Sequence, residues 1–383
     1  MTIVILIIFF VGYLAIVFEE AIHINKTASA LITGILCWTA TMVLSPDATL
    51  SLEHYSSWTA LVESKLMHQI AEIASILFFL LGAMTIVELI DAHQGFRIIT
   101  DAIKTKSTIT LLWLIVIITF LLSSVLDNLT TAIVMITIVG RILNEKDLRW
   151  WFGGAIIIAS NAGGAWSPIG DVTTTMLWIG GQITPVNIIK MLIVPSLISA
   201  ILPTLYIAWQ LKRTKQTKLS PIKIEKDKPV QGRTLIFVVG ILGLLFVPVF
   251  KTLTHLPPVL GILLSLGVIW AITEIVHKKS DFEERKKLTA AHALSRIDSS
   301  SILFFLGILL AIGSLDTIGV LEQLAVVLNG AVGNPEYIAI IIGAASAVVD
   351  NVPLVAASMG MYDLTSFPTD HPFWELLAYA AGT

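Results

Sequence analysis

The sequence predicts an all-α polytopic membrane protein, built as an inverted-topology repeat with re-entrant hairpins and broken helices. Three observations lead to this expectation: the composition, the recurring apolar segments and one polar motif that occurs twice. Of 383 residues, 56% are hydrophobic and 13% are charged, whereas globular domains carry about 25% charged residues. A soluble protein of this composition would lack polar residues to cover its surface. We therefore expect an integral multi-pass protein, in a bacterial cytoplasmic (inner) membrane.

Several other classes of protein are excluded by the same composition. The formal net charge of −3 argues against nucleic acid as a partner, because nucleic-acid-binding proteins present basic patches. The single cysteine, Cys37, has no partner for a disulfide. No P-loop, GxSxG, HExxH or paired CxxC motif occurs, so we expect neither an enzyme nor a bound cofactor.

Apolar segments follow one another along the whole chain. A spanning helix needs roughly 20 residues, so segment 108–143 is too long for one helix and barely long enough for two. Its centre is polar, which favours a hairpin that enters and leaves on one side and is covered by protein at that depth. The expected membrane segments are 2–18, 27–44, 69–90, 108–143, 152–181, 188–209, 234–250, 258–276, 301–319, 336–360 and 373 onward.

Basic residues predict the orientation of these segments, because Lys and Arg concentrate in cytoplasmic loops. Loop 210–233 holds eight and loop 277–300 holds six, whereas the loops expected outside hold only Lys65 and Lys251. No Lys or Arg follows Ser301. The first hairpin is therefore expected to open to the cytoplasm and the second to the exterior, as in an inverted repeat.

An internal repeat is visible in the letters. The string "SILFFL" occurs at 75–80 and at 301–306, and the Asp-Asn pairs of the two hairpins are 223 residues apart. The expected parts are 1–68 (N-terminal transmembrane helices), 69–209 (repeat 1, with hairpin 108–143 and broken helix 152–181), 210–233 (cytoplasmic linker) and 234–383 (transmembrane helices and repeat 2, with hairpin 336–360).

The two hairpins carry the motifs "SSVLDNLTTAIVM" and "SAVVDNVPLVAAS", which contain Asp127-Asn128 and Asp350-Asn351. A charged side chain within a span costs roughly 2.5 to 3.5 kcal/mol. Neither hairpin offers a nearby Lys or Arg, so a bound cation or a proton is the expected partner of each aspartate. The alternative is structural: both aspartates cap the hairpin turns, a geometry that Asp favours.

A third polar cluster is "ASNAGGAWSPIGDVTTT" at 159–175. Its glycines and proline predict a helix broken within the membrane, and the broken ends expose backbone groups that can bind an ion. Oxygen ligands suit hard cations such as sodium, and the cluster supplies them from Ser160, Asn161, Ser167, Asp171 and Thr173.

Two further expectations concern the rest of the chain. Glu88 near the cytoplasmic end of its span is either a proton entry point or a solvated interfacial acid. With the offset of 223, the counterpart of Asn161 would be residue 384, so we expect repeat 2 to be truncated at the C-terminus.

The motifs "SSVLDNLTTAIVM" and "SNAGGAWSPIGDVTTTMLW" resemble the NhaD type of sodium/proton antiporter, in the ion transporter superfamily of arsenite permeases and dicarboxylate carriers. The resemblance runs from about residue 70 to the chain end. It implies that Asp127, Asn128, Ser160, Asn161, Asp350 and Asn351 surround the ion site. Where dicarboxylate carriers are expected to have Ser-Asn-Thr, this chain has Asp-Asn, which repels a dianion and attracts a cation.

The expected function is a secondary transporter that exchanges sodium for protons, with lithium as a second candidate cation. Sodium would bind at Asp127, Asn128, Asn161, Asp350 and Asn351, and protons would compete for the same carboxylates. A sodium-coupled carboxylate or arsenite transporter of the same superfamily is one alternative. An intramembrane aspartyl protease that uses Asp127 and Asp171 is another. The expected partners are sodium, protons and the lipid bilayer, and the oligomeric state is left open between a monomer and a homodimer.

Overall fold

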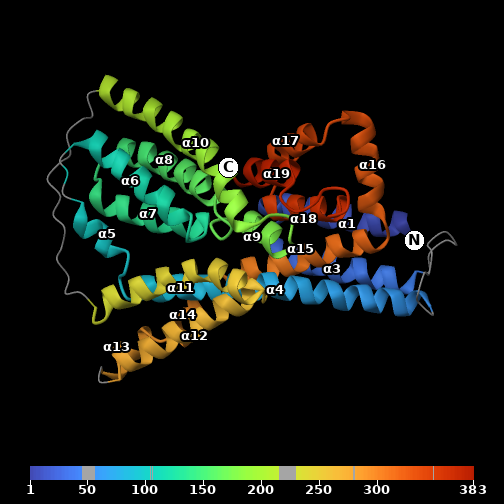
Figure 1. Ribbon diagram of the computed structural model, residues 1–383, viewed down its shortest axis with the longest axis horizontal. Helices are drawn as coiled ribbons and strands as arrows, with labels where there is room; N and C mark the ends of the chain where they lie inside the picture. The colour runs from blue at the N-terminus through green and yellow to red at the C-terminus, as the bar shows by residue number, and fades with distance from the viewer. Residues whose placement is uncertain (45–56, 104, 106, 215–229, 279–280, 348) are drawn as a thin grey trace. The chain divides into compact units, whose positions relative to one another are not determined.

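The computed structural model describes residues 1–383 except 45–56, 104, 106, 215–229, 279–280 and 348 (Figure 1). The elements of the described residues are all α-helices. The helices are α1 (Thr2–Val17), α2 (Glu19–Ile22), α3 (Lys26–Val43), α4 (Trp58–Ala92), α5 (Arg97–Ala102), α6 (Thr108–Ser123), α7 (Asn128–Ile142), α8 (Lys146–Ala165), α9 (Val172–Ile179), α10 (Pro185–Arg213), α11 (Arg233–Thr254), α12 (Pro258–Val276), α13 (Phe282–Lys287), α14 (Ala290–Arg296), α15 (Ser299–Thr317), α16 (Val320–Val332), α17 (Pro335–Ser346), α18 (Asn351–Met361) and α19 (Pro372–Gly382).

Six of the described helices, α3, α4, α10, α11, α12 and α15, are long and apolar enough to cross a membrane. A seventh span is added if α16 and α17, which meet at a bend of 109°, count as one. Many large apolar side chains on these helices are exposed, such as Leu202 on α10 and Leu242 on α11, as expected for surfaces that face lipid. The prediction of an all-α polytopic membrane protein is confirmed.

Short helices occur where the sequence predicts hairpins. Within 108–143, α6 has 16 residues and α7 has 15, and within 336–360 α17 has 12 and α18 has 11. At 1.5 Å per residue each is about 16 to 24 Å long, less than the ~30 Å of a bilayer core. The broken helix is α8 and α9, separated by residues 166–171.

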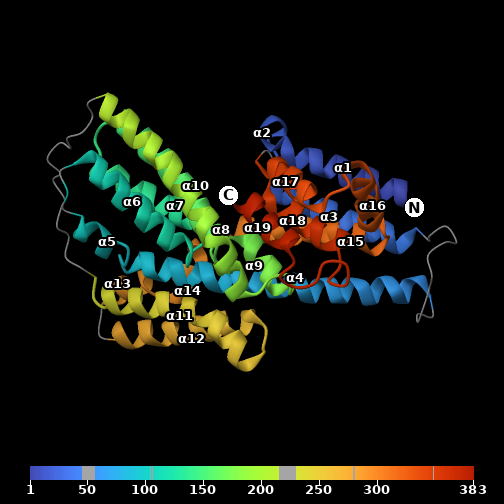
Figure 2. The ribbon, with the colours of Figure 1, turned by 45° about the horizontal axis from the view of Figure 1, so that its top comes forward.

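The chain divides into two compact units, which we describe separately. Unit 1 contains residues 1–80, 179–182 and 298–381, and unit 2 contains 81–178, 183–297 and 382–383. In unit 1, α3 and α15 pack side by side (Figures 1 and 2). The glycines Gly34 and Gly307 meet there: a Cβ atom on Gly34 would lie 2.4 Å from the Gly307 carbonyl oxygen. Small residues allow this close approach of membrane helices.

Polar pairs reinforce the packing of α3 against α15. The Thr27 hydroxyl donates to the Ser300 carbonyl at 3.0 Å, the Trp38 indole N–H donates to the Leu310 carbonyl at 2.8 Å, and the hydroxyls of Thr41 and Ser314 lie 2.9 Å apart. Asp298 caps α15 by accepting from the backbone N–H groups of Ser300 and Ser301. These bonds fix the register of the two helices.

In unit 2, the hairpin helices α6 and α7 pack against α8, and α10 lies against α6 and α8 (Figures 1 and 2). The helices α6 and α8 approach closely at Gly163, where a Cβ atom would lie 2.3 Å from the Phe120 carbonyl oxygen. The helices α11 and α12 form a second pair, joined by the Ser265 hydroxyl, which donates to the Gly243 carbonyl at 2.9 Å. The broken helix and the first hairpin are therefore held within one compact unit.

Two sequence expectations about the elements are wrong. The residues directly before 69 were expected to be a loop, but α4 begins at Trp58. Hydropathy marks the lipid-embedded part of a helix, and this helix continues beyond it with exposed Glu63 and Lys65. The amphipathic helix α16, with Glu322 in its first turn, was missed because its polar residues interrupt the apolar pattern.

A buried histidine pair joins the ends of α4 and α12 in unit 2. His93 follows α4, is 0% exposed and donates from Nδ1 to the Leu89 carbonyl at 2.7 Å. Its Nε2 lies 2.9 Å from Nε2 of His277, which is 2% exposed. Because His93 Nδ1 carries a hydrogen, its Nε2 accepts from His277 when both rings are neutral.

We expect this pair to make the protein less stable in acid. Burial, and to a lesser extent His277, lowers the pKa of His93 below 6.5, although the bond to Leu89 opposes this shift. The unfolded chain then binds more protons than the folded one as the pH falls below 6.5, so stability is present above that pH and is lost on acidification. The melting temperature of the detergent-solubilised protein should be lower at pH 5.5 than at pH 8. A His93→Leu/His277→Leu variant should lack this decrease, and His68→Gln, a change at an exposed site, should retain it. An equal loss in both variants would contradict this prediction.

Candidate functional site

The turn of the first hairpin places Asp127 as the N-cap of α7. Its carboxylate accepts from the Thr130 backbone N–H at 2.8 Å and from the Thr130 hydroxyl at 2.5 Å. The first of these bonds satisfies one of the orphan N–H groups at the start of the helix. The structure therefore shows the helix-capping role that was the alternative to ion binding for Asp127. The Asp127 carboxylate is stabilised by Thr130 of its own turn.

One buried acid of unit 2 is Asp171, which ends the break between α8 and α9 and is 1% exposed. Its Oδ2 accepts from the Asn128 side-chain amide at 2.7 Å, and its Oδ1 accepts from the Thr173 backbone N–H at 2.7 Å and from the Thr173 hydroxyl. The same Asn128 amide nitrogen also donates to Oδ1 of Asn161 at 3.1 Å. Four predicted site residues, Asn128, Asn161, Asp171 and Thr173, are therefore joined in one network.

Two serine bonds join the hairpin turn to the broken helix. The Ser123 hydroxyl donates to the Ser160 carbonyl, and the Ser167 hydroxyl donates to the Ser124 carbonyl, each at 2.5 Å. The Ser124 carbonyl lies at the C-terminal end of α6, where the backbone lacks an intrahelical donor, whereas the Ser160 carbonyl lies within α8. The Ser160 hydroxyl itself donates to Ile157 within its own helix, so this residue contacts the hairpin through its backbone.

Glycines allow these backbones to approach each other. A Cβ atom on Gly170 would lie 2.4 Å from the Ser123 carbonyl oxygen, and one on Gly164 would lie 2.5 Å from the Gly170 carbonyl oxygen. Cβ atoms in proteins essentially never lie closer than 3.0 Å to a backbone atom, so no side chain fits at either position. The "NAGGAWSPIGD" glycines therefore bring Asp171 beside Asn128, which is their structural role.

Two oxygens of this network face the same donor. The Asn128 side-chain nitrogen donates to both the Asp171 carboxylate and the Asn161 amide oxygen. Carboxylate and amide oxygens are the ligands that hard cations take, and in this structure the Asn128 amide occupies them. Asp171 also lies at the N-terminal end of α9, where the helix dipole favours its negative charge.

The second hairpin belongs to unit 1 and repeats the capping geometry. Asp350 is the N-cap of α18 and accepts from the Val352 backbone N–H at 3.2 Å. Asn351 follows it and donates from its side chain to the Ala381 carbonyl at 3.3 Å. In both hairpins the Asp therefore caps the helix, and the Asn bonds across to the helix that follows the hairpin.

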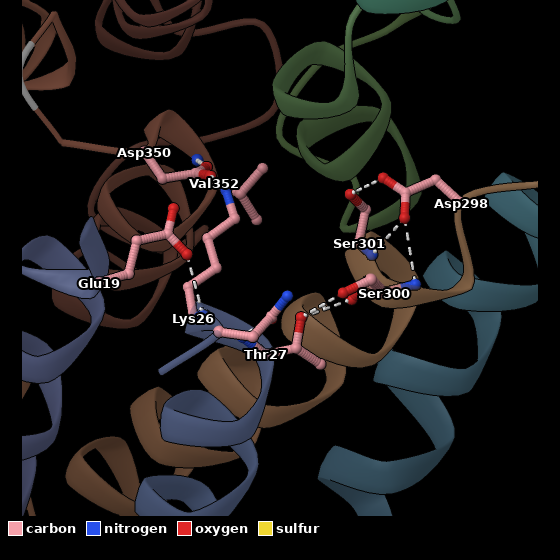
Figure 3. Close-up of polar contacts among 9 residues, drawn as sticks. Glu19, Lys26, Thr27, Asp298, Ser300, Ser301, Asp350 and Val352 are labelled. Atoms are coloured by element: carbon pink, nitrogen blue, oxygen red, sulfur yellow. Dashed lines mark hydrogen bonds and ion pairs between the residues drawn. The ribbon is translucent and has the colours of Figure 1, made fainter. Parts of the chain in front are cut away.

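The expectation that no basic residue is near Asp350 is wrong. Lys26, at the start of α3, places its Nζ atom 3.7 Å from Oδ2 of Asp350 (Figure 3). The two residues are far apart in the sequence, so no pattern local to the hairpin reveals the pair. Their only sequence signal is a lysine at the very beginning of an apolar span.

Glu88 has a basic partner as well. One of its carboxylate oxygens lies 2.8 Å from a guanidinium nitrogen of Arg296, which ends α14. This ion pair was not expected from the sequence. It makes Glu88 part of a charged contact in unit 2, and its role as a proton entry point stays a proposal.

The family model described as "Citrate transporter", CitMHS, matches residues 13–382. Sodium/proton antiporter 1 of Arabidopsis thaliana is 47% identical over 98% of this chain and 63% of its own length. Sodium/proton antiporter 2 of the same plant is 46% identical over 98% of this chain and 87% of its own length. The Na(+)/H(+) antiporter NhaD of Alkalimonas amylolytica is 28% identical over 98% of this chain and 79% of its own length.

The chain therefore spans less than two thirds of the first of these relatives, and more of the other two. The family match covers nearly all of the described elements, from the middle of α1 to the end of α19. The resemblance to the NhaD type, inferred from the hairpin and broken-helix motifs, is confirmed. The chain belongs to the CitMHS citrate transporter family, and within its superfamily to the NhaD type.

Proposed function

We propose that the protein is a secondary transporter, not an enzyme, that exchanges sodium for protons across its membrane, with lithium as a second candidate. The observation that carries this proposal is the network around Asp171. A nearly fully buried carboxylate, with converging amide and hydroxyl groups, lies where a hairpin turn meets a helix break. The printed names of the relatives, which are sodium/proton antiporters, support the same exchange.

We propose that sodium binds in unit 2 at Asn128, Asn161 and Asp171, with Thr173 and Asp127 beside them. Ser160 would contribute through its backbone. Asp350 and Asn351 of unit 1 are the corresponding proposal for repeat 2. Sodium and protons would compete for these carboxylates, because either one neutralises the charge that burial makes costly.

The transport cycle would follow from the repeat. Inverted repeats with broken helices reorient one element against another around a central site. The proposed parts remain repeat 1 (69–209), the linker (210–233) and repeat 2 within 234–383. The matching Asp-cap and Asn-bridge of the two hairpins support this division.

Two finer proposals concern the setting of the protein. A bacterial cytoplasmic membrane is supported by the NhaD relative of Alkalimonas amylolytica, while the plant relatives have the higher identity. A homodimer is the proposed alternative to a monomer. Density-gradient fractionation of the host membranes, and light scattering of the detergent-solubilised protein, test these two proposals.

The alternatives have less support. The three relatives reported above are named for sodium and proton exchange, and not for arsenite or a carboxylate, while the family model is described as a citrate transporter. For an aspartyl protease, Asp127 and Asp171 would have to share a proton as a dyad. In the structure, Asp127 bonds to Thr130 while Asp171 bonds to Asn128 and Thr173.

The test is sodium-driven proton movement in everted membrane vesicles. After respiration acidifies the interior, we expect addition of sodium to restore the fluorescence of a pH dye, and addition of potassium to do so far less. Vesicles without the protein provide the background. If sodium has no effect between pH 7 and 9, the proposal is wrong, and uptake of labelled citrate or arsenite with sodium should be measured in the same vesicles.

A further inference from the structure

The backbone of Lys26 is anchored by a hydrogen bond, whereas its long side chain makes only loose contacts. It is the first residue of α3, and its backbone N–H donates to the Glu19 carboxylate at 3.0 Å, while Asn25 caps the helix by accepting from the Thr27 N–H. From this anchored start the side chain extends to Asp350 in the second hairpin (Figure 3). Its ammonium also lies 4.8 Å from the centre of the Phe304 ring, at a distance that allows a cation–π contact.

The contact with Asp350 is a loose one. The separation of 3.7 Å is longer than the 2.7 to 3.2 Å of a direct N–H···O hydrogen bond. The Lys26 side chain is 38% exposed and the Asp350 side chain 27% exposed. Partly exposed ion pairs of this kind contribute little stability, so the Lys26 ammonium can separate from Asp350 at low cost.

The partner of Asp350 is carried on a flexible side chain. The Glu19 carboxylate accepts from the Lys26 backbone N–H, and the Lys26 ammonium lies near Asp350 and the Phe304 ring. The lysine stem has four carbons and can move its ammonium while α3 stays in place. A small cation that reaches Asp350 can therefore displace the Lys26 ammonium from the carboxylate.

We propose that Lys26 is a tethered cation that occupies Asp350 in the sodium-free state and is displaced when sodium binds at the second hairpin. This inference rests on the proposed sodium/proton exchange. Lys26 is a positioning residue, since it acts through Asp350. Its positive charge competes with sodium and sets the sodium concentration at which the second hairpin is half-saturated.

The first test compares Lys26→Gln with Lys26→Arg in the vesicle assay. Removing the charge should lower the half-saturating sodium concentration about two- to fivefold, as expected for loss of a partly exposed competing pair. The arginine variant keeps the charge and should resemble the parent. The exposed lysine Lys190 of α10 provides a matched control, Lys190→Gln, which should also resemble the parent.

A change in stability alone would not move the half-saturating concentration, so this readout separates competition from a structural role. If Lys26→Gln leaves that concentration unchanged or raises it, the inference is overturned. It is equally overturned if Lys26→Arg shifts the concentration as far as Lys26→Gln does.

A second measurement does not depend on transport. The purified protein is acetylated briefly with N-hydroxysuccinimidyl acetate, with sodium or with choline, and the modification of Lys26 is quantified by mass spectrometry. Displacement from Asp350 should raise Lys26 acetylation in sodium about twofold or more, while Lys190 acetylation stays constant. Equal acetylation of Lys26 in both salts overturns the inference, whether or not the vesicles show sodium-driven proton movement. If the vesicles fail but Lys26 responds to sodium, the proposed exchange is wrong and the competition stands.

Discussion

Replacement of Asp171 by asparagine is expected to slow sodium-driven proton movement strongly. The variant keeps the shape of the side chain but removes the charge that Asn128 and Thr173 stabilise. Hydrogen bonds to charged groups are worth about 1.5 to 3 kcal/mol, and we expect the initial rate to fall about ten- to a hundredfold. The measurement is the dequenching rate of a pH dye at saturating sodium, normalised to the amount of protein in the vesicles.

The matched control is Asp147→Asn, an exposed acid in the first turn of α8, which should retain the parent rate. Asp127→Asn distinguishes the two explanations of the hairpin aspartate. Asparagine is as good an N-cap as aspartate, so a purely structural Asp127 would tolerate the change. Loss of exchange in well-folded Asp127→Asn protein would show that its charge is needed. A normal rate in Asp171→Asn would remove the buried network from the ion site.

The sequence was informative where function depends on local patterns. Apolar length predicted the lipid-embedded helices, and the short helices α6 and α7 lie within the predicted range 108–143. The Asp-Asn motifs and the glycine-rich break predicted which residues carry polar groups into the membrane. Asn128, Asn161, Asp171 and Thr173 were all candidates before their contacts were known.

The roles of individual acids could not be predicted, because they depend on contacts between distant segments. The repeat drew attention to Asp127 and Asp350, but among the acids of unit 2 whose burial the structure describes, the buried one is Asp171. Asp127 is held by Thr130 within its own turn. The partner of Asp350 comes from the start of α3, and no local motif specifies a pair across that separation.

Gly163→Ala is expected to destabilise the packing of unit 2 around the site. The added Cβ would lie 2.3 Å from the Phe120 carbonyl oxygen and 2.8 Å from the Phe120 Cα. Both atoms belong to the backbone of α6, so no side-chain rotation can relieve the contact. Overpacking in a well-packed core costs about 1 to 3 kcal/mol, and here it would also separate the turn at Ser123 from α8, to which the Ser123 hydroxyl donates.

The same helix provides the control for this prediction. A Cβ on Gly154 would meet nothing within 4 Å, and alanine is favoured over glycine in a helix interior by about 0.5 to 1 kcal/mol. Gly154→Ala should therefore match or exceed the parent in melting temperature and in abundance in the membrane. Gly163→Ala should fall clearly below the parent in both, and its remaining protein should exchange sodium slowly. If the two alanine variants behaved alike, α6 and α8 would not be as close as the structure places them, and the network joining Asn128 to Asp171 would lose its support.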